Sequence, residues 1–423
     1  MIRKLIFALA LLIATPGPAY AQEASAELRA RAEQVAELLR GGADPAEMFT
    51  PAFLAQVPAT QLRTTSGQLT AQYGAPQGVE GIDVRSATAG TIRLGMARAV
   101  LRLDIQIEPN APHRISGLLV AGADTRGDSL AAIVEEMRML PGRTALSVVR
   151  LGEEPAVAIA HNADQPLAIG SAFKLIVLAE LSRQIGEGRH RWDEVVRIDR
   201  RSLPSGQLQD WPEGAPVTIH TLAALMISRS DNTATDILLH LTGRENVERM
   251  MARIGIAPDS RNQPFLSTYE AFVLKAGPEP VRRAWAAADE AGRRQLLVGE
   301  VAAVTREQLD PTRFASPTGI DTIEWFVSTA DLAKVMAWLL VNGDDSARAI
   351  LAISPGVDAA TARDFGYLGY KGGSEAGVIN MTYLVRNRAG VWHAVAGSWN
   401  DPAGPVDNNR FAALMARAIQ QLR

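Results

Sequence analysis

The stretch Leu167–Leu181, LAIGSAFKLIVLAEL, decides the fold of the second part of the chain. Its apolar residues would surround a helix on every face, a pattern typical of a helix buried in the middle of a domain. Lys174 interrupts this pattern, and a buried ammonium group is costly unless it is paired, hydrogen-bonded or neutral. Ser171 lies three residues earlier on the same helical face, directly after Gly170. The stretch therefore predicts a nucleophilic hydroxyl beside a lysine base.

A purely structural interpretation of the same residues stays open. Ser171 suits the N-cap of a helix, and Lys174 can reach solvent along its apolar stem. Because the pattern S-x-x-K is short and common, the rest of the chain has to decide between the two interpretations.

Length and composition favour two domains with hydrophobic cores, since 47% of the 423 residues are hydrophobic. The net charge of −3 argues against a nucleic-acid partner. The chain has no cysteine, which excludes disulfides, a lipid-modified cysteine and a thiol nucleophile.

The N-terminus, MIRKLIFALALLIATPGPAYAQ, is typical of a secretory signal peptide over residues 1–21. Basic residues precede an apolar run from Leu5 to Ala14, and Ala19-Tyr20-Ala21 forms a small-residue cleavage site. A membrane anchor is the alternative, but the run is short for a bilayer. We expect a secreted or periplasmic protein that begins near Gln22 and has no stable membrane anchor.

Residues 22–125 predict a small α+β domain. Apolar spacing indicates helices at Ala26–Leu39 and Pro45–Val57, and Ala121–Asp128 has the composition of a linker. Extended segments are expected between them, at Ile82–Ala87, Thr91–Met96, Ala99–Glu108 and Arg114–Val120.

Residues 126–423 predict a second α+β domain, in which strands before and after a long helical region form one antiparallel sheet with terminal helices on its face. The helical region would form a separate lobe and reach about Asn342. The expected terminal helices are Ser129–Met139 and Asn409–Leu422, and the expected strands are Ala145–Leu151, Ala156–His161, Leu368–Lys371, Val378–Arg386 and Val391–Trp399.

Two further motifs fall in this domain. Ser230-Asp231-Asn232 separates the expected helices Thr221–Ser228 and Thr233–Leu241, and Lys371-Gly372-Gly373-Ser374 ends an expected strand. Each has a structural alternative, because Ser, Asp and Asn start helices and a glycine pair after a strand usually marks a bulge or turn.

S-x-x-K, S-D-N and K-[TS]-G, in this order, are the signature set of class A β-lactamases and penicillin-binding proteins. From about Leu130 to Arg423 the chain resembles this serine-hydrolase superfamily. The separation of 59 residues between Ser171 and Ser230, and the sequence Met226–Ala234, are close to the class A pattern.

The resemblance implies a role for each matching residue. Ser171 would be the acylated nucleophile, Lys174 its base or proton relay, and Ser230 a proton shuttle. Asn232 would orient the substrate, while the substrate-binding wall would comprise Lys371, Gly373 and Ser374, with an oxyanion hole formed by the backbone N–H groups of Ser171 and Ser374. The resemblance requires no metal and no cofactor.

Two departures from the pattern matter. Gly372 replaces the usual Thr or Ser of the third motif, which removes a hydroxyl from the binding wall. The E-x-x-x-N motif, which positions the deacylating water in class A enzymes, is missing. Glu270 lies near the place of that acid in the sequence and is a candidate for its role, but Ser267-Thr268-Tyr269-Glu270 also fits a capped helix start.

An N-terminal α+β domain before such a domain also resembles the serine hydrolases encoded with clavulanic-acid biosynthesis, whose N-terminal domain is steroid-isomerase-like. We expect an exported serine hydrolase that acts on β-lactam-like amides or small esters and deacylates slowly. Two alternatives remain: a D,D-carboxypeptidase of the penicillin-binding class, and a non-catalytic protein that binds β-lactams or peptidoglycan fragments.

Overall fold

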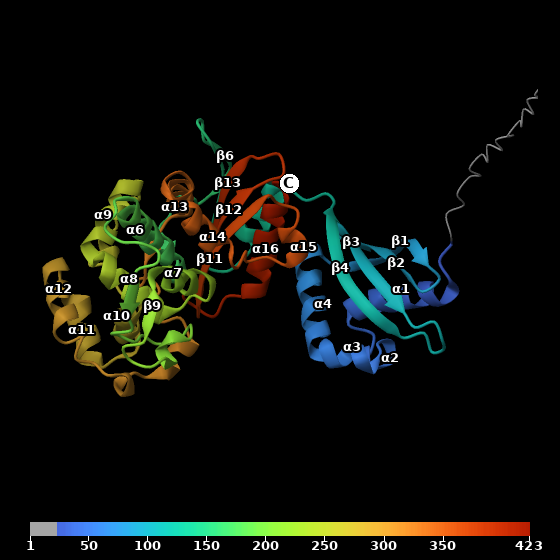
Figure 1. Cartoon of the computed structure of the whole chain (residues 1–423), viewed down its shortest axis with the longest axis horizontal. Helices are drawn as coiled ribbons and strands as arrows, with labels where there is room; N and C mark the ends of the chain where they lie inside the picture. Colours follow the sequence, from blue (N-terminus) through green and yellow to red (C-terminus); the bar gives the residue numbers. More distant parts are fainter. Residues whose placement is uncertain (1–22) are drawn as a thin grey trace, which may run out of the picture. The chain divides into compact units, whose positions relative to one another are not determined.

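The computed structural model of the chain describes residues 23–423, so the predicted signal peptide and cleavage site lie outside the described residues. The chain forms two compact units (Figure 1). One comprises residues up to Ser66 with Pro76–Met96 and Val100–Ala121, and the other comprises Gly67–Ala75, Ala97–Ala99 and Gly122–Arg423. Within residues 23–423, no helix has the length and apolar character needed to cross a bilayer.

The N-terminal part begins with three helices. Helix α1 (Ala26–Arg40) ends at Gly41, whose φ of 82° suits glycine. The predicted helix Pro45–Val57 is in fact two helices, α2 (Pro45–Met48) and α3 (Pro51–Gln56). The interruption arises because Pro51 has no N–H with which to continue a helix, while Thr50 caps the new one.

Helix α4 (Ala59–Tyr73) was not predicted, because its many threonines and glutamines hide any apolar face. A four-stranded sheet follows it in the order β1-β2-β3-β4. The strands are β1 (Pro76–Ser86), β2 (Ala89–Met96), β3 (Ala99–Ile107) and β4 (Ile115–Thr125). Strand β4 extends into the segment that was predicted as a linker.

The larger unit is built on one five-stranded antiparallel sheet in the order β11-β12-β13-β5-β6. Two of its strands precede the helical region and three follow it, as predicted, so the α+β fold class is confirmed. The strands are β5 (Arg143–Leu151), β6 (Ala156–His161), β11 (Tyr367–Glu375), β12 (Val378–Arg386) and β13 (Trp392–Asn400).

Helices cover both faces of this sheet. The terminal helices α5 (Leu130–Arg138) and α16 (Asn408–Gln420) bury residues such as Ile133 and Phe411 against one face. On the other face, α13 (Thr329–Asn342) contacts β5, β12 and β13 and joins the sheet to the helical lobe. Edge strand β11 is the strand of the sheet that adjoins the lobe, which appears in green and yellow in Figure 1.

The lobe is entirely helical apart from short two-stranded ladders. Its principal helices surround α6 (Lys174–Gly186), whose residues are buried from Lys174 through Ser182. The others are α7 (Ile219–Ser228), α8 (Asn232–Thr242), α9 (Arg244–Ile254), α10 (Thr268–Ala276), α11 (Glu279–Ala287), α12 (Glu290–Val298) and α14 (Asp345–Ala352). The short helix α15 (Ala359–Ala362) instead lies beside α16, where the Gln420 amide donates to the Thr361 hydroxyl. The segment after α10 forms two helices rather than one, because Asp289 caps a new start.

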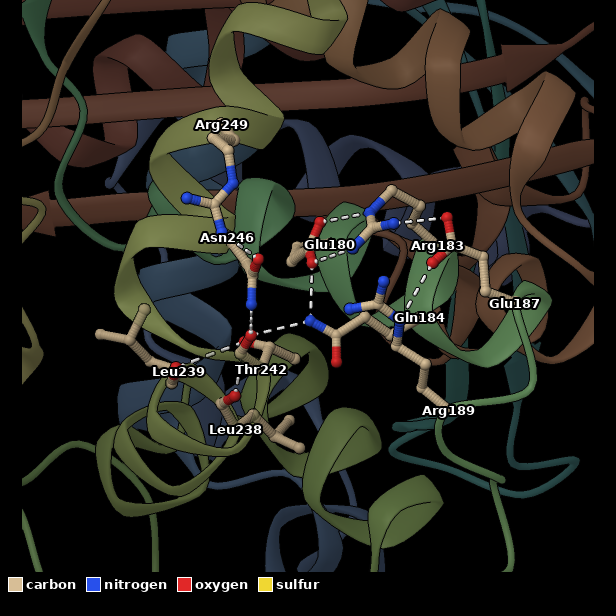
Figure 2. A network of polar contacts seen from close by, with 10 residues as sticks. All are labelled: Glu180, Arg183, Gln184, Glu187, Arg189, Leu238, Leu239, Thr242, Asn246 and Arg249. Atoms are coloured by element: carbon tan, nitrogen blue, oxygen red, sulfur yellow. Dashed lines mark hydrogen bonds and ion pairs between the residues drawn. The ribbon is translucent and has the colours of Figure 1, made fainter.

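A polar network fixes α6 against the end of α8 (Figure 2). The buried carboxylate of Glu180 accepts hydrogen bonds from Arg183 at 2.7 and 2.8 Å and from Gln184 at 2.6 Å. The Gln184 amide also donates to the Thr242 carbonyl at 2.7 Å, as does Asn246. Because α6 begins at Lys174 and α8 at Asn232, this network holds the two helices whose N-termini carry predicted site residues.

Candidate active site

Ser171 lies in one turn of 3-10 helix, η1 (Gly170–Phe173), which directly precedes α6. The prediction of a single helix over Leu167–Leu181 is therefore wrong in its first part, where Leu167–Ala168 is a short strand, β7. Strand β7 pairs with β10 (Phe326–Val327), and the left-handed φ of Gly170, 47°, turns the chain from strand into helix. Residues three apart share a face of a 3-10 helix, so Ser171 keeps its predicted side relative to Lys174.

Strand β11 approaches η1 too closely for a side chain at position 373. A Cβ atom on Gly373 would overlap the Ser171 nitrogen and the Ile169 oxygen, and would lie 2.7 Å from the Gly170 carbonyl carbon. The glycine pair is not a turn or bulge, since β11 and β12 keep an unbroken register through Glu375. This contact brings the backbone of Ser374 beside that of Ser171, where the family resemblance implies an oxyanion hole.

Lys174 is fully buried and connects the first motif to the second. Its Nζ donates to the Ser230 carbonyl oxygen at 2.7 Å, to the Ser230 hydroxyl at 3.1 Å and to Asn232 Oδ1 at 2.7 Å. Burial, reinforced by the charge of Lys371, holds the pKa of Lys174 well below its usual value. Among residues 23–423, no hydrogen bond joins Lys174 to the Ser171 hydroxyl.

Ser230 lies between two lysines. Its hydroxyl contacts Lys174 Nζ and, also at 3.1 Å, Nζ of Lys371, which is only 3% exposed. The Lys371 ammonium also donates to the Gly372 carbonyl. Burial lowers the pKa of Lys371 to about 7. Lys371 therefore contacts the second motif directly and the first motif through the Ser230 hydroxyl.

The rest of the second motif fixes the turn. The Asp231 carboxylate accepts hydrogen bonds from the Gln207 and Leu208 N–H groups at 2.7 and 2.9 Å, and it caps α8 by accepting from the Ala234 N–H at 2.9 Å. Asn232 donates to the Leu203 carbonyl at 3.1 Å. Asp231 thus holds the turn together, as its sequence position suggested, and Asn232 faces the cavity described next.

A cavity of about 280 Å³ opens beside the nucleophile. Three predicted site residues line it: Ser171, Asn232 and Ser374. Its other walls come from residues that sequence reasoning did not single out, namely Thr268, Phe272, Lys275, Arg313, Phe314, Glu324, Trp325 and Glu375.

A buried charge cluster forms part of this cavity. Lys275, 3% exposed, makes an ion pair with Glu324 and donates a hydrogen bond to Glu375 Oε1 at 2.5 Å, and Glu324 Oε2 also accepts the Gly170 N–H at 3.2 Å. Burial and the neighbouring charge of Glu324 raise the pKa of Glu375 to about 8. A lysine in an apolar helical segment was the signal that identified Lys174, and the same signal in Phe272–Lys275 could have identified this cluster.

The structure does not bring Glu270 to the nucleophile. Its carboxylate forms a two-armed ion pair with Arg244 at 2.6 and 2.9 Å and accepts the Ser267 N–H at 2.7 Å. The reciprocal contacts with Ser267 form a capping box, so the competing structural interpretation is confirmed. Glu270 lines a different cavity, and its candidacy as the deacylating acid is corrected accordingly.

No group of three or more His, Cys, Asp or Glu side chains within residues 23–423 is arranged to hold a metal ion. The chemistry available at the site comes from a hydroxyl, two lysines of lowered pKa and closely spaced backbone N–H groups. This set is suited to covalent acyl transfer.

Comparison with known families finds one match. The model of the beta-lactamase enzyme family matches residues 128–307, a segment that contains the first two motifs and ends before Lys371. The comparison with curated proteins finds none that matches.

Solved structures similar to this chain include β-lactamases and a protein named PBP-A. A β-lactamase from Sphaerobacter thermophilus shares 20% identity at a TM-score of 0.48 and covers 69% of this chain and 95% of its own. PBP-A shares 15% sequence identity at a TM-score of 0.46, and the match covers 69% of this chain and 94% of PBP-A. A β-lactamase from Chitinophaga pinensis shares 16% sequence identity at a TM-score of 0.46, and the match covers 69% of this chain and 96% of that β-lactamase.

Proposed function

We propose that the chain is an exported serine hydrolase of the β-lactamase and penicillin-binding superfamily. It acts on β-lactam-like amides or small esters through an acyl-enzyme at Ser171. The observation that carries the proposal is the Ser230 hydroxyl, which lies 3.1 Å from both Lys174 and Lys371 and so joins the three motifs in one place. The family match over residues 128–307 supports it.

Acylation follows from the protonation states that burial favours. The Ser171 oxygen attacks the substrate carbonyl carbon while its proton passes to the neutral amine of Lys174. The backbone N–H groups of Ser171 and Ser374 stabilise the oxyanion. When the C–N bond breaks, the leaving nitrogen takes the proton of the Ser230 hydroxyl, which regains one from the Lys174 ammonium. Lys371 attracts the substrate carboxylate.

We further propose that deacylation is slow near neutral pH. Of the carboxylates that line the cavity, Glu324 is held by Lys275 and two backbone N–H groups. Glu375, with a pKa of about 8, is mostly protonated at pH 7 and cannot accept a proton from water. Deacylation is expected to accelerate as pH rises through about 8, where Glu375 becomes ionised.

The test is turnover of nitrocefin and p-nitrophenyl esters, with intact-mass spectra taken during the reaction. The proposal predicts a burst of product equal to the enzyme concentration, followed by a slow steady rate and an accumulated adduct. Glu375→Gln is expected to remove the acceleration above pH 8. Fast turnover of penicillin at pH 7 without a burst would contradict slow deacylation.

The same assays separate the two alternatives. A D,D-carboxypeptidase would release D-alanine from a pentapeptide stem, and its cavity would accept the peptide beside Ser171. A non-catalytic binding protein would bind β-lactams tightly and reversibly without a mass shift.

Two further parts of the proposal concern the rest of the chain. Residues 1–21 are proposed to be a signal peptide and residues 22–125 a separate domain of the steroid-isomerase-like type. Helices followed by the four-stranded sheet β1–β4 support the second point.

A further inference from the structure

The two backbone N–H groups of the proposed oxyanion hole come from separate parts of the fold. That of Ser171 belongs to η1, and that of Ser374 belongs to the edge strand β11. The two backbones pack closely, since a Cβ atom on Gly170 would lie 3.2 Å from the Ser374 nitrogen. Within residues 23–423, however, no backbone hydrogen bond joins η1 to β11. The spacing of the two N–H groups therefore depends on packing and on contacts made by side chains.

A buried bridge of side chains connects these two parts. Glu324 Oε2 accepts the N–H of Gly170, the residue before the nucleophile, at 3.2 Å, and Glu324 Oε1 accepts from Lys275 Nζ at 2.5 Å. The same ammonium donates at 2.5 Å to Oε1 of Glu375, the residue that follows the second N–H donor in the chain. The bridge thus begins one residue before the first donor of the oxyanion hole and ends one residue after the second.

Lys275 is held firmly at the centre of this bridge. It lies near the end of α10, its side chain is 3% exposed, and its carbonyl accepts a hydrogen bond from Arg313 Nε at 2.8 Å. Burial lowers the pKa of Lys275, but the carboxyl groups of Glu324 and Glu375 raise it by more, so the amine stays an ammonium with three N–H donors. Hydrogen bonds from such a charged donor are short and strong.

The acylation steps proposed above give Lys275 no part in proton transfer. Those protons pass between Ser171, Lys174 and Ser230, whereas among the described residues the Lys275 ammonium donates only to the two glutamates of the bridge. A buried ammonium group is costly unless its partners compensate for lost water. Its place at the cavity therefore indicates a role other than that of a base.

We propose that Lys275 is a positioning residue whose bridge, through Glu324 and Glu375, sets the distance between the two N–H groups of the oxyanion hole. The inference rests on the acyl-transfer function proposed above. An oxyanion hole works only when both donors point at the same oxygen, and loss of one donor slows acyl transfer by about 100- to 1,000-fold. Without the bridge, η1 and β11 can move apart and the hole becomes less effective.

The test compares p-nitrophenyl acetate with its O-thionoester, in which sulfur replaces the carbonyl oxygen. For both, the second-order rate constant of acylation at pH 7 is read from the burst of p-nitrophenolate. Sulfur is larger than oxygen and a weak hydrogen-bond acceptor, so the oxyanion hole accelerates the oxygen ester selectively. The ratio of the two rate constants therefore reports on the oxyanion hole, whereas a loss of folded protein lowers both equally.

Lys275→Met removes the ammonium and keeps the length of the side chain. We expect acylation by the oxygen ester to fall about 10- to 100-fold and acylation by the thionoester to change little, because only the first depends on exact placement of the donors. Lys334→Met is the matched control. Lys334 pairs with Asp331 in α13 through a half-exposed side chain, and its loss should leave the ratio unchanged.

Two variants of Glu375 test the other end of the bridge, and they decide the matter if Lys275→Met does not fold. Glu375→Gln keeps an oxygen acceptor for Lys275 and should keep the ratio, whereas Glu375→Leu removes the acceptor and should lower it. A wild-type ratio in folded Lys275→Met, or the same ratio in both Glu375 variants, would overturn the inference while acylation at Ser171 stands. If neither ester acylates the wild-type protein, the proposed function itself fails and the inference fails with it.

Discussion

At the scale of single residues, the site depends on two lysines that burial makes unusually acidic. Lys174 and Lys371 contact the same hydroxyl, that of Ser230, and each would be fully protonated in water at neutral pH. In the protein, the pKa of Lys174 lies well below its usual value and that of Lys371 is about 7. The amine of Lys174 is thus available as a base, while Lys371 changes its charge within the physiological pH range.

This difference predicts a pH dependence of acylation. As pH rises through about 7, Lys371 in the free protein loses its proton and with it the charge that attracts a carboxylate. Acylation by a carboxylate-bearing penicillin should therefore decline above pH 7, whereas acylation by an uncharged ester should not. The measurement is the second-order acylation rate from pH 5.5 to 9. Parallel profiles for the two substrates would show that Lys371 does not set the dependence.

The sequence predicted most residues of the candidate active site but not all of their contacts. Ser171, Lys174, Ser230, Asn232 and Lys371 were identified by motif, and the structure groups them. Glu270 was misleading, because a capping glutamate and a catalytic glutamate have the same local sequence pattern. Glu324 and Glu375 lie 51 positions apart in the chain and meet only through Lys275, a contact that no local pattern contains.

At the scale of secondary structure, the turn before α8 depends on one carboxylate. Asp231 is fully buried and accepts three backbone hydrogen bonds, from Gln207, Leu208 and Ala234. It therefore caps α8 and also anchors the loop that packs against Ser230.

Asp231→Ala should lower the free energy of unfolding by about 2–4 kcal/mol, because it removes a helix cap and also the acceptor of the part-buried Gln207 N–H and the buried Leu208 N–H. Urea denaturation measures the change. Asp289→Ala is the control, since Asp289 caps α12 through one exposed hydrogen bond and its loss should cost only about 1 kcal/mol. Similar losses in both variants would mean that the loop contacts of Asp231 contribute nothing.

The elements that the sequence predicted poorly are those decided by distant partners. Apolar composition predicted a helix over the whole of Leu167–Leu181, yet Leu167–Ala168 pairs with β10, which lies more than 150 residues later in the chain. The predicted end of strand β11 at Lys371 is too early, because the glycine pair that follows continues the strand and permits close contact with η1 instead of making a turn. Amphipathic segments with local caps, such as α1 and α5, were predicted to within a residue or two.

At the scale of the whole molecule, the prediction of one sheet from strands at both ends of a domain is confirmed. That prediction depended on counting strands on either side of the helical region, and such counting tolerates errors at the boundaries. The domain limits of 22–125 and 126–423 stay a prediction.

Export is a further prediction at this scale. If residues 1–21 are a signal peptide, expression in a Gram-negative host should yield a periplasmic protein whose first residue is Gln22. N-terminal sequencing or intact mass of the periplasmic fraction measures this. A protein that keeps Met1 and remains with the cytoplasmic fraction would contradict it.

The most direct test of the central claim is the site of acylation by benzylpenicillin, determined by intact-mass spectrometry and peptide mapping. We predict a single adduct on the peptide that contains Ser171, absent from Ser171→Ala and retained in Ser228→Ala, where the lost hydroxyl donates to the Ala224 carbonyl within α7. An adduct that persists in Ser171→Ala, or reversible binding without any adduct, would contradict the claim that this hydroxyl is the nucleophile.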